Sequence, residues 1–216
     1  MKKENKRKIE QVLFIISLLF SLIIFPFLPA KIPSHFNSEG IPSYSSKFTI
    51  FFFPILLLIF ILLFKYLPKI DPLKENYKFF NKYYEEFKLV IMLYFLYLQV
   101  LIIFYSFIPF KMNFFIILGI SLLFLEISRL LKHCRRTWFL GIRTPWTLSS
   151  DLVWQKTHEF GSKVFLFLAI YTLNSYFFIK GNLYYIFFII ILLFSILLIF
   201  YYSYSVFKLQ KQTKKI

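Results

Sequence analysis

The residues best suited to chemistry gather in one polar segment, Gly141 to Lys163, set between long apolar runs. Ser150, Asp151 and His158 are the residue types of a hydrolytic triad, but the Gly-x-Ser-x-Gly turn that exposes a nucleophilic serine is missing. His158 begins a zinc-protease motif whose second histidine would stand where Ser162 is. The segment therefore predicts no enzyme, and we expect no catalytic residue, metal site or cofactor.

Recognition of a partner is the other chemistry open to this segment. Arg143 presents five N–H donors in a planar fork that matches a carboxylate or a phosphate. Pro145 fixes its own φ and disfavours the helical region for Thr144, so residues 141–147 should run extended or turned. The segment is then either a recognition surface or a plain connector that docks on neighbouring helices.

A short amphipathic helix should follow this extended part. Ser149 and Ser150 offer hydroxyls for its N-cap, and Gly161 could end it. At about 100° per residue, apolar and polar side chains separate onto opposite arcs. The inner arc holds Val153, Trp154, Thr157 and Phe160, and the outer arc holds Asp151, Gln155, His158 and Glu159. We predict a short helix lying on the membrane surface, between the fourth and fifth spans given next.

Composition places the whole chain in a membrane. Its 216 residues are 59% hydrophobic and 17% charged, with 32 Phe and 15 Tyr. One soluble core cannot bury so much apolar side chain, whereas a bilayer-spanning helix needs about 20 mostly apolar residues. Six runs qualify, at 9–28, 48–67, 89–108, 114–131, 163–179 and 183–207. They lack the alternation of a barrel strand, so the predicted fold class is all-α and polytopic, with six transmembrane helices.

The distribution of lysine and arginine predicts the orientation. Of the 26 Lys and Arg, only Lys31, Lys47, Lys111 and Lys180 fall on one side of the predicted helices. The positive-inside rule then places both termini and the stretch 132–163 in the cytosol. The net charge of +16 is spread over these cytosolic edges, where anionic lipid headgroups are the ordinary partner. We therefore expect the lipid bilayer as partner and no direct binding of nucleic acid; the pattern does not predict an oligomeric state.

The cytosolic stretch also carries the three Trp and the single Cys of the chain. Trp138, Trp146 and Trp154 favour the headgroup layer, because indole joins an apolar body to one N–H donor. Cys134 has basic neighbours that would favour a reactive thiolate; alternatively it is a bystander thiol.

A second polar patch, residues 29–47, is predicted on the outer side. Asn37 and Gly40 suit the first and last positions of a type I turn, and three prolines stiffen the flanks, so we expect a shaped hairpin. His35 could form a titratable pair with Glu39 or be an ordinary solvated residue. The candidate binding residues of this loop are Pro33, His35, Asn37, Gly40 and Lys47.

The few polar side chains within the bilayer could be structural or could bind a solute. Glu126 and Arg129 are three residues apart and share one face of a helix, as an interfacial ion pair or as part of a solute site. Gln99 and Asn174 are expected to join helices by hydrogen bonds. A small-solute transporter that uses Glu126, Arg129 and Gln99 is therefore an alternative function.

The run GIRTPWTLSSDLVWQKTHEFGSKVF, residues 141–165, resembles the signature of the SdpI-like family. The outer loop is similar to a short motif of an uncharacterised domain that is often fused to that family. Its matching residues are Leu28, Pro29, Ile32, Pro33, His35, Phe36, Asn37, Gly40, Pro42 and Lys47. The resemblance divides the chain into residues 1–67, two helices with the outer loop, and residues 68–216, a four-helix part with the cytosolic signature loop 132–163.

This resemblance implies a multi-pass protein of the bacterial plasma membrane that protects its host from a secreted, membrane-acting peptide toxin. It further implies that an autorepressor protein is held at the membrane from inside, and we expect the toxin to be met outside, at the outer loops, or in the bilayer. The residues it singles out for partner binding are Gly141, Arg143, Thr144, Pro145, Trp146, Thr147, Trp154 and Lys163. Gly141 and Pro145 would shape the loop, and Arg143 would anchor it. A structural partner of another membrane protein is a further alternative.

Overall fold

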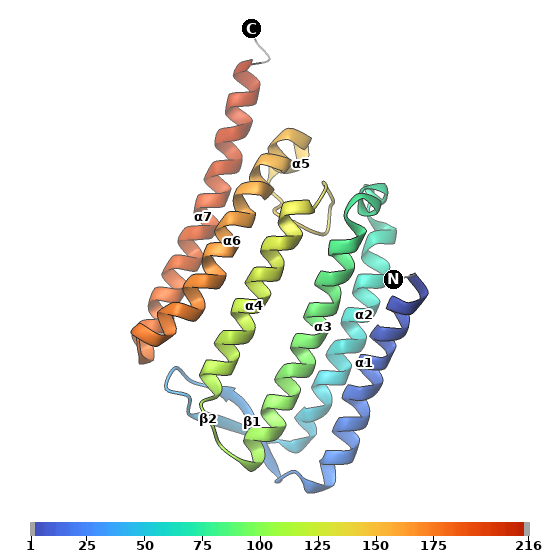
Figure 1. Cartoon of the computed structure of the whole chain (residues 1–216), viewed down its shortest axis with the longest axis vertical. Helices are drawn as coiled ribbons and strands as arrows, with labels where there is room; N and C mark the ends of the chain where they lie inside the picture. The colour runs from blue at the N-terminus through green and yellow to red at the C-terminus, as the bar shows by residue number, and fades with distance from the viewer. Residues whose placement is uncertain (1–2, 214–216) are drawn as a thin grey trace. The chain divides into compact units, whose positions relative to one another are not determined.

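The computed structural model describes residues 3–213, with side chains from Lys8 onward (Figure 1). Lys2, Lys214 and Lys215 of the predicted cytosolic tails lie outside the described residues. The helices are α1 (Lys3–Ile24), α2 (Phe52–Ile70), α3 (Tyr77–Phe107), α4 (Met112–His133), α5 (Pro145–Ser149), α6 (Asp151–Phe178) and α7 (Gly181–Thr213). Strands β1 (Lys31–Phe36) and β2 (Pro42–Ser46) and the 3-10 turns η1 (Phe25–Phe27), η2 (Lys47–Phe51) and η3 (Lys74–Asn76) complete the description.

Five helical stretches of the described chain are long and apolar enough to cross a membrane. They are Lys8–Phe27, Lys47–Ile70, Lys74–Phe107, Met112–His133 and Gly181–Thr213. They match five of the six predicted runs and confirm an all-α, polytopic membrane protein. The remaining run, 163–179, forms the second part of α6, whose first part is polar. The count of six spans and the cytosolic position of both termini stay predictions.

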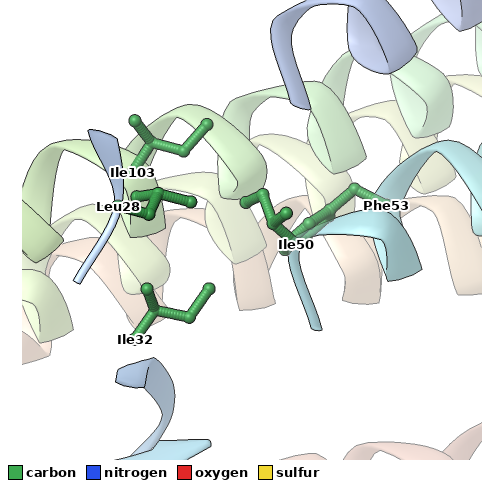
Figure 2. Packing of buried hydrophobic residues seen from close by; sticks show 5 residues of the cluster. All are labelled: Leu28, Ile32, Ile50, Phe53 and Ile103. Atoms are coloured by element: carbon green, nitrogen blue, oxygen red, sulfur yellow. The ribbon is translucent and has the colours of Figure 1, made fainter. Parts of the chain in front are cut away.

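The chain forms two compact units. Unit 1 contains the described residues up to Lys65 together with 88–119, and unit 2 contains 66–87 and the described residues from 120 onward. A core cluster of unit 1 brings together side chains that follow η1 or lie in β1, η2, α2 and α3. Figure 2 shows its members Leu28, Ile32, Ile50, Phe53 and Ile103, all buried. This cluster fixes the base of the outer loop. The sequence-based division at residues 67 and 68 stays a prediction.

The loop predicted on the outer side is a two-stranded antiparallel hairpin, which confirms the predicted shaped turn. The N–H of Gly40 donates to the carbonyl of Asn37 at 2.9 Å, and Gly40 has a φ of +82° that favours glycine. The Asn37 side chain accepts from the N–H of Ile41 at 2.8 Å, and Asn113 donates to the Asn37 carbonyl from α4 at 3.2 Å. These bonds hold the turn from both sides.

The other loop residues of interest differ in role. Pro33 is buried, whereas His35 and Glu39 are both exposed, and no ion pair described in the structure joins them. Lys47 donates to the carbonyl of Phe25 at 3.2 Å and its Nζ lies 4.4 Å from the centre of the Phe25 ring. Lys47 therefore holds the hairpin to the end of the first span.

Gln99 joins α3 to α1, as predicted. Its amide oxygen accepts from the hydroxyl of Ser17 at 2.6 Å, and its Nε2 donates to the Ser17 carbonyl at 3.0 Å and to Ser21 Oγ at 2.8 Å. All three side chains are buried. In a bilayer such bonds take the place of water, which the hydrocarbon region cannot supply. Asn174, in contrast, donates to the carbonyl of Ile170 in its own helix, so its expected role between helices is wrong.

Replacing Gln99 by leucine should destabilise unit 1 by about 1 kcal/mol, the usual size of a side-chain hydrogen bond between membrane helices. The unfolding free energy in mixed micelles, measured by denaturing-detergent titration, checks this value. Asn174→Leu is the matched control, because its bond lies within one exposed helical turn. Equal effects of the two changes would contradict a role of Gln99 between helices.

In unit 2, α6 and α7 run antiparallel and side by side (Figure 1). Small polar residues bring α4 close to α6. The hydroxyl of Ser128 donates to the carbonyl of Ser162 at 2.7 Å, and that of Ser121 donates to the carbonyl of Ala169 at 2.6 Å. This packing fixes the end of α4 beside the start of α6, where the polar segment of the sequence lies.

Candidate functional site

We call residues 141–163 the signature segment. It follows a loop that leaves α4 at Cys134, and it contains α5 and the first part of α6. The backbone is extended at Thr144, and α5 begins at Pro145. The N–H of Thr147 donates to Thr144 Oγ1 at 3.1 Å, and the N–H of Thr144 donates to Thr147 Oγ1 at 2.8 Å. This reciprocal cap, with proline in the first turn, starts a helix inside the stretch 141–147 that we expected to be extended or turned.

Ser150 is the N-cap of α6, as predicted. Its Oγ accepts from the N–H of Val153 at 3.4 Å and donates to Gln210 of α7 at 2.8 Å. The expected end of this helix at Gly161 is wrong, because α6 continues to Phe178. The predicted short surface helix and the fifth predicted span are thus one helix.

Packing explains Gly161. A Cβ at this position would lie 2.4 Å from Cδ1 of Ile142. Glycine therefore leaves room for the loop to press on the helix, and this contact offsets the roughly 1 kcal/mol that glycine costs within a helix.

His158 is buried, with 2% of its surface exposed, although the helical arcs placed it on the outer side. Its Nε2 accepts from the N–H of Ile142 at 2.9 Å, so the proton is on Nδ1, which donates to the carbonyl of Trp154 at 2.8 Å. The prediction fails because the loop before α5 folds back over the arc that was assigned to solvent. Burial lowers the pKa of the His158 imidazole to about 4.

Trp154 lies beneath the same loop and does not reach the surface. Its Nε1 donates to the carbonyl of Cys134 at 2.9 Å, and its ring stacks on that of His158 with centroids 3.9 Å apart. Cys134 is also buried, and burial raises the pKa of its thiol to about 12. Burial of this kind disfavours the thiolate, so the structure favours the reading of Cys134 as a bystander thiol over that of a poised thiolate.

Asp71 ties the loop between α2 and α3 to the loop after α4. This buried carboxylate accepts from the N–H of Trp138 at 2.9 Å, from the hydroxyl of Tyr77 at 3.1 Å and from the N–H of Leu73 at 2.7 Å. Asn76 adds a bond from its Nδ2 to the carbonyl of Arg136 at 2.6 Å. Sequence reasoning missed both residues; the one signal was an Asp-Pro pair inside a lysine-rich loop.

Helix α7 holds the signature segment from another side. Thr144 Oγ1 lies 3.1 Å from Ser203 Oγ within hydrogen-bonding distance. The ring of Trp146 packs between Phe200 and Tyr204, with centroid distances of 4.9 and 5.1 Å. Trp146 is therefore seated on a helix of the bundle.

The predicted binding residues divide into support and surface. Thr144, Thr147 and Trp154 are buried within the fold of the segment. The exposed ones are Arg143, Pro145 and Lys163. Arg143 donates from Nη1 to the carbonyl of Trp138 at 2.7 Å, which closes the loop and leaves the rest of the fork facing solvent. Lys163 lies 3.6 Å from Glu159 on the exposed side of α6.

The ion pair predicted within the bilayer is present, and a third charged residue joins it. Arg129 donates from Nη1 to Glu126 and from Nη2 to Glu86, each at 3.0 Å. Glu86 was not singled out from the sequence, because nothing in the pattern shows which face of α3 meets α4. Gln99 belongs to unit 1 and these three charges to unit 2. A shared solute site of Gln99, Glu126 and Arg129 stays a prediction.

Acidification should destabilise unit 2 through His158. An unfolded histidine has a pKa of about 6.5, so between about pH 6.5 and 4 the unfolded chain binds a proton that the folded one does not. The buried, neutral His158 contributes its full stabilisation above this window. This stabilisation is lost as the pH falls through the window, by about 3 kcal/mol in total. Thermal unfolding at pH 7 and 4.5 should show a smaller loss of stability on acidification in His158→Gln than in the wild type.

The control is His35→Gln, at an exposed histidine, which should keep the full loss. An undiminished loss in His158→Gln would contradict the buried neutral state of His158.

Comparison with known proteins matches two regions to families. Residues 133–203 match the SdpI/YfhL protein family, and residues 12–69 match a domain of unknown function, DUF1648. The immunity protein SdpI of Bacillus subtilis (strain 168) is 30% identical to this chain over 163 residues, which are 74% of this chain and 76% of that protein. The chain belongs to the SdpI/YfhL family. This confirms the resemblance seen in the sequence. No solved structure matches the chain.

Membership of the SdpI/YfhL family, together with the five apolar helices, makes this chain a multi-pass protein of the bacterial membrane. Neither family description names an enzyme. The SdpI/YfhL match starts at the end of α4 and includes the loop, the signature segment and the contact at Ser203. Asp71 and Asn76 lie between the two matched regions, so neither family match includes these two supports of the loop.

Proposed function

We propose that this chain is an immunity protein, which protects its cell from a secreted, membrane-acting peptide toxin. The observation that carries the proposal is the 30% identity, over about three quarters of both chains, to a protein that bears that name. The outer hairpin fits the proposal. It is a hydrogen-bonded turn that exposes Ile41 and Tyr44, with 57% and 56% of their surfaces accessible. A preorganised loop that exposes these two hydrophobic side chains among polar ones is suited to contact a peptide at low entropic cost.

The finer part of the proposal is that the signature segment holds a repressor protein at the cytosolic face. Its exposed surface offers the Arg143 fork for a carboxylate, and the preceding loop adds Trp138, 49% exposed, as an aromatic contact. Bonds to Ser203 and Gln210 hold the backbone beneath this surface in place. The partner expected from this chemistry is a protein with an acidic side chain flanked by apolar ones.

Survival of a toxin-sensitive Bacillus subtilis strain, deprived of its own immunity protein, tests the immunity function. Cells that express this chain should survive a toxin dose that kills cells carrying the empty vector. Killing at the vector's level, with the chain confirmed in the membrane fraction, would contradict the proposal.

Arg143→Ala tests the repressor-holding surface. We expect the affinity of the membrane for a tagged repressor, encoded beside this protein's gene, to fall at least about tenfold, since a hydrogen bond to a charged group contributes about 1.5 to 3 kcal/mol and about 1.4 kcal/mol is tenfold in affinity. Lys156→Ala is the matched control, because it removes an exposed positive charge from α6 outside this surface. Unchanged capture in Arg143→Ala would exclude the assigned role.

A small-solute transporter is the second candidate, and one observation favours it. Glu126 is buried, and its Oε1 has no hydrogen-bond partner in the described part of the chain. An unpartnered carboxylate oxygen inside a bilayer is a candidate for binding a proton or a cation. Uptake by proteoliposomes should then be lost in Glu126→Gln; uptake that is insensitive to this change would remove the chemical basis of the candidate.

A further inference from the structure

A cleft of about 680 Å³ opens in unit 2 at the end of α4. Its walls come from η3 and the start of α3, from the last turn of α4 with the loop after it, and from the first turns of α6. Its volume lies within the range of small-molecule sites, roughly 300 to 1,000 Å³. The cleft lies apart from the Arg143 surface described above, since Arg143 is not among its lining residues.

The lining of the cleft is basic. Lys132, Arg135 and Arg136 contribute three positive charges, and Asp151 is the one carboxylate among the described lining residues. The Asp151 side chain is largely exposed, and its oxygen lies 3.0 Å from Nε of Arg136. The excess of positive charge, confined by protein walls, favours an anion in the cleft.

The Arg136 guanidinium has N–H groups available for a ligand. Its Nη1 donates to the carbonyl of Leu148 at 3.1 Å, which fixes the guanidinium. Its buried Nε is close to Asp151 but makes no hydrogen bond to any described atom, because the N–H does not point at the carboxylate. The guanidinium has five N–H groups, and those not engaged by Leu148 and Asp151 can donate to an oxyanion in the cleft.

Aromatic rings line the cleft beside these charges. The His133 ring stacks on Tyr83 with centroids 3.7 Å apart, and the Arg135 guanidinium lies 5.9 Å from the centre of the Phe79 ring. The apolar span that ends at His133 places the cleft where a membrane surface would lie. Basic pockets at this depth are suited to the headgroups of anionic lipids.

We propose that this cleft binds a phosphate-bearing anion, supplied by the headgroup of an anionic phospholipid. Lys132 and Arg135 attract the charge, Arg136 donates to a phosphate oxygen, and the rings cover the adjoining glycerol. The site is independent of the proposed immunity function. Soluble phosphate shares the same chemistry and is distinguished by the experiment.

Native mass spectrometry of the full chain in neutral detergent tests the site, with phosphatidylglycerol, phosphatidylcholine and inorganic phosphate added separately. The test variant is the double change Lys132→Ala and Arg135→Ala. Its matched control is Lys156→Ala and Lys208→Ala, which removes the same charge from exposed positions outside the cleft. All four side chains are exposed, so both variants should keep the wild-type melting temperature.

The wild type should retain phosphatidylglycerol in preference to phosphatidylcholine. The test variant should bind phosphatidylglycerol at least about tenfold more weakly, and the control should change less than about twofold. If inorganic phosphate instead binds with the same sensitivity to the variants, the cleft is a phosphate site with a soluble source. Equal losses of binding in both variants would overturn the proposal, because they would show only diffuse attraction to positive charge. Absence of binding of both phosphatidylglycerol and inorganic phosphate would overturn it as well.

Discussion

Gly141→Ala should lower the unfolding free energy of unit 2 by about 3 kcal/mol or more, because two costs coincide. Gly141 has a φ of +96°, a conformation that side-chain-bearing residues rarely adopt. A Cβ there would lie 2.4 Å from Nε2 of His158 and 2.9 Å from the ring of Trp154. The histidine would have to move, and the bond from the N–H of Ile142 would be lost.

The matched control for this change is Gly181→Ala. Gly181 also has a positive φ, of +60°, but no atom lies within 4 Å of the added Cβ. Its substitution should cost only the backbone strain, about 1 kcal/mol. Denaturing-detergent titrations, followed by tryptophan fluorescence, compare the two variants. Equal losses would show that the loop does not press on His158 as described.

Asp71→Ala should destabilise unit 2 to a similar degree, by about 3 kcal/mol or more, since each buried donor left without an acceptor costs about 1 to 3 kcal/mol. The change deprives three donors, the N–H of Trp138, the hydroxyl of Tyr77 and the N–H of Leu73, of one shared carboxylate. We also expect the loop after α4 to loosen, because its bond to Asp71 connects it to the loop between α2 and α3.

Hydrogen exchange of the Trp138 amide measures this loosening directly. The amide should exchange at least about tenfold faster in Asp71→Ala. Asp151→Ala is the control. It removes a carboxylate whose side chain is 79% exposed and paired with Arg136, so its cost should stay below about 1 kcal/mol. An unchanged exchange rate of Trp138 in Asp71→Ala would contradict the tether.

Local signals in the sequence predicted local structure correctly. Apolar length identified the five helices that are long and apolar enough to span a membrane, and the spacing of Asn37 and Gly40 identified the hairpin turn. Ser150 was recognised as a cap because its hydroxyl stands directly before a helical pattern. In each case the physical cause lies within a few residues of its effect, so the pattern alone was sufficient.

Contacts between distant segments were beyond such reasoning. His158 was assigned to solvent because helical arcs describe one helix and not a loop that folds over it. Gly161 was interpreted as a helix end because its packing partner, Ile142, lies 19 residues earlier in the chain. The tether at Asp71 joins residues 67 apart. Of the residues proposed for partner binding, burial removes Thr144, Thr147 and Trp154 from direct contact and leaves Arg143 as the main candidate.

Labelling of single cysteines in intact cells tests most directly whether the signature segment faces the cytosol. In a Cys134→Ser background, Ser149→Cys places a thiol on exposed α5, and Ser43→Cys places one on the exposed outer hairpin. A membrane-impermeant maleimide should label the hairpin variant in intact cells and the α5 variant only after permeabilisation. Labelling of the α5 variant in intact cells would put the signature segment outside the cell, where it could hold no cytosolic repressor.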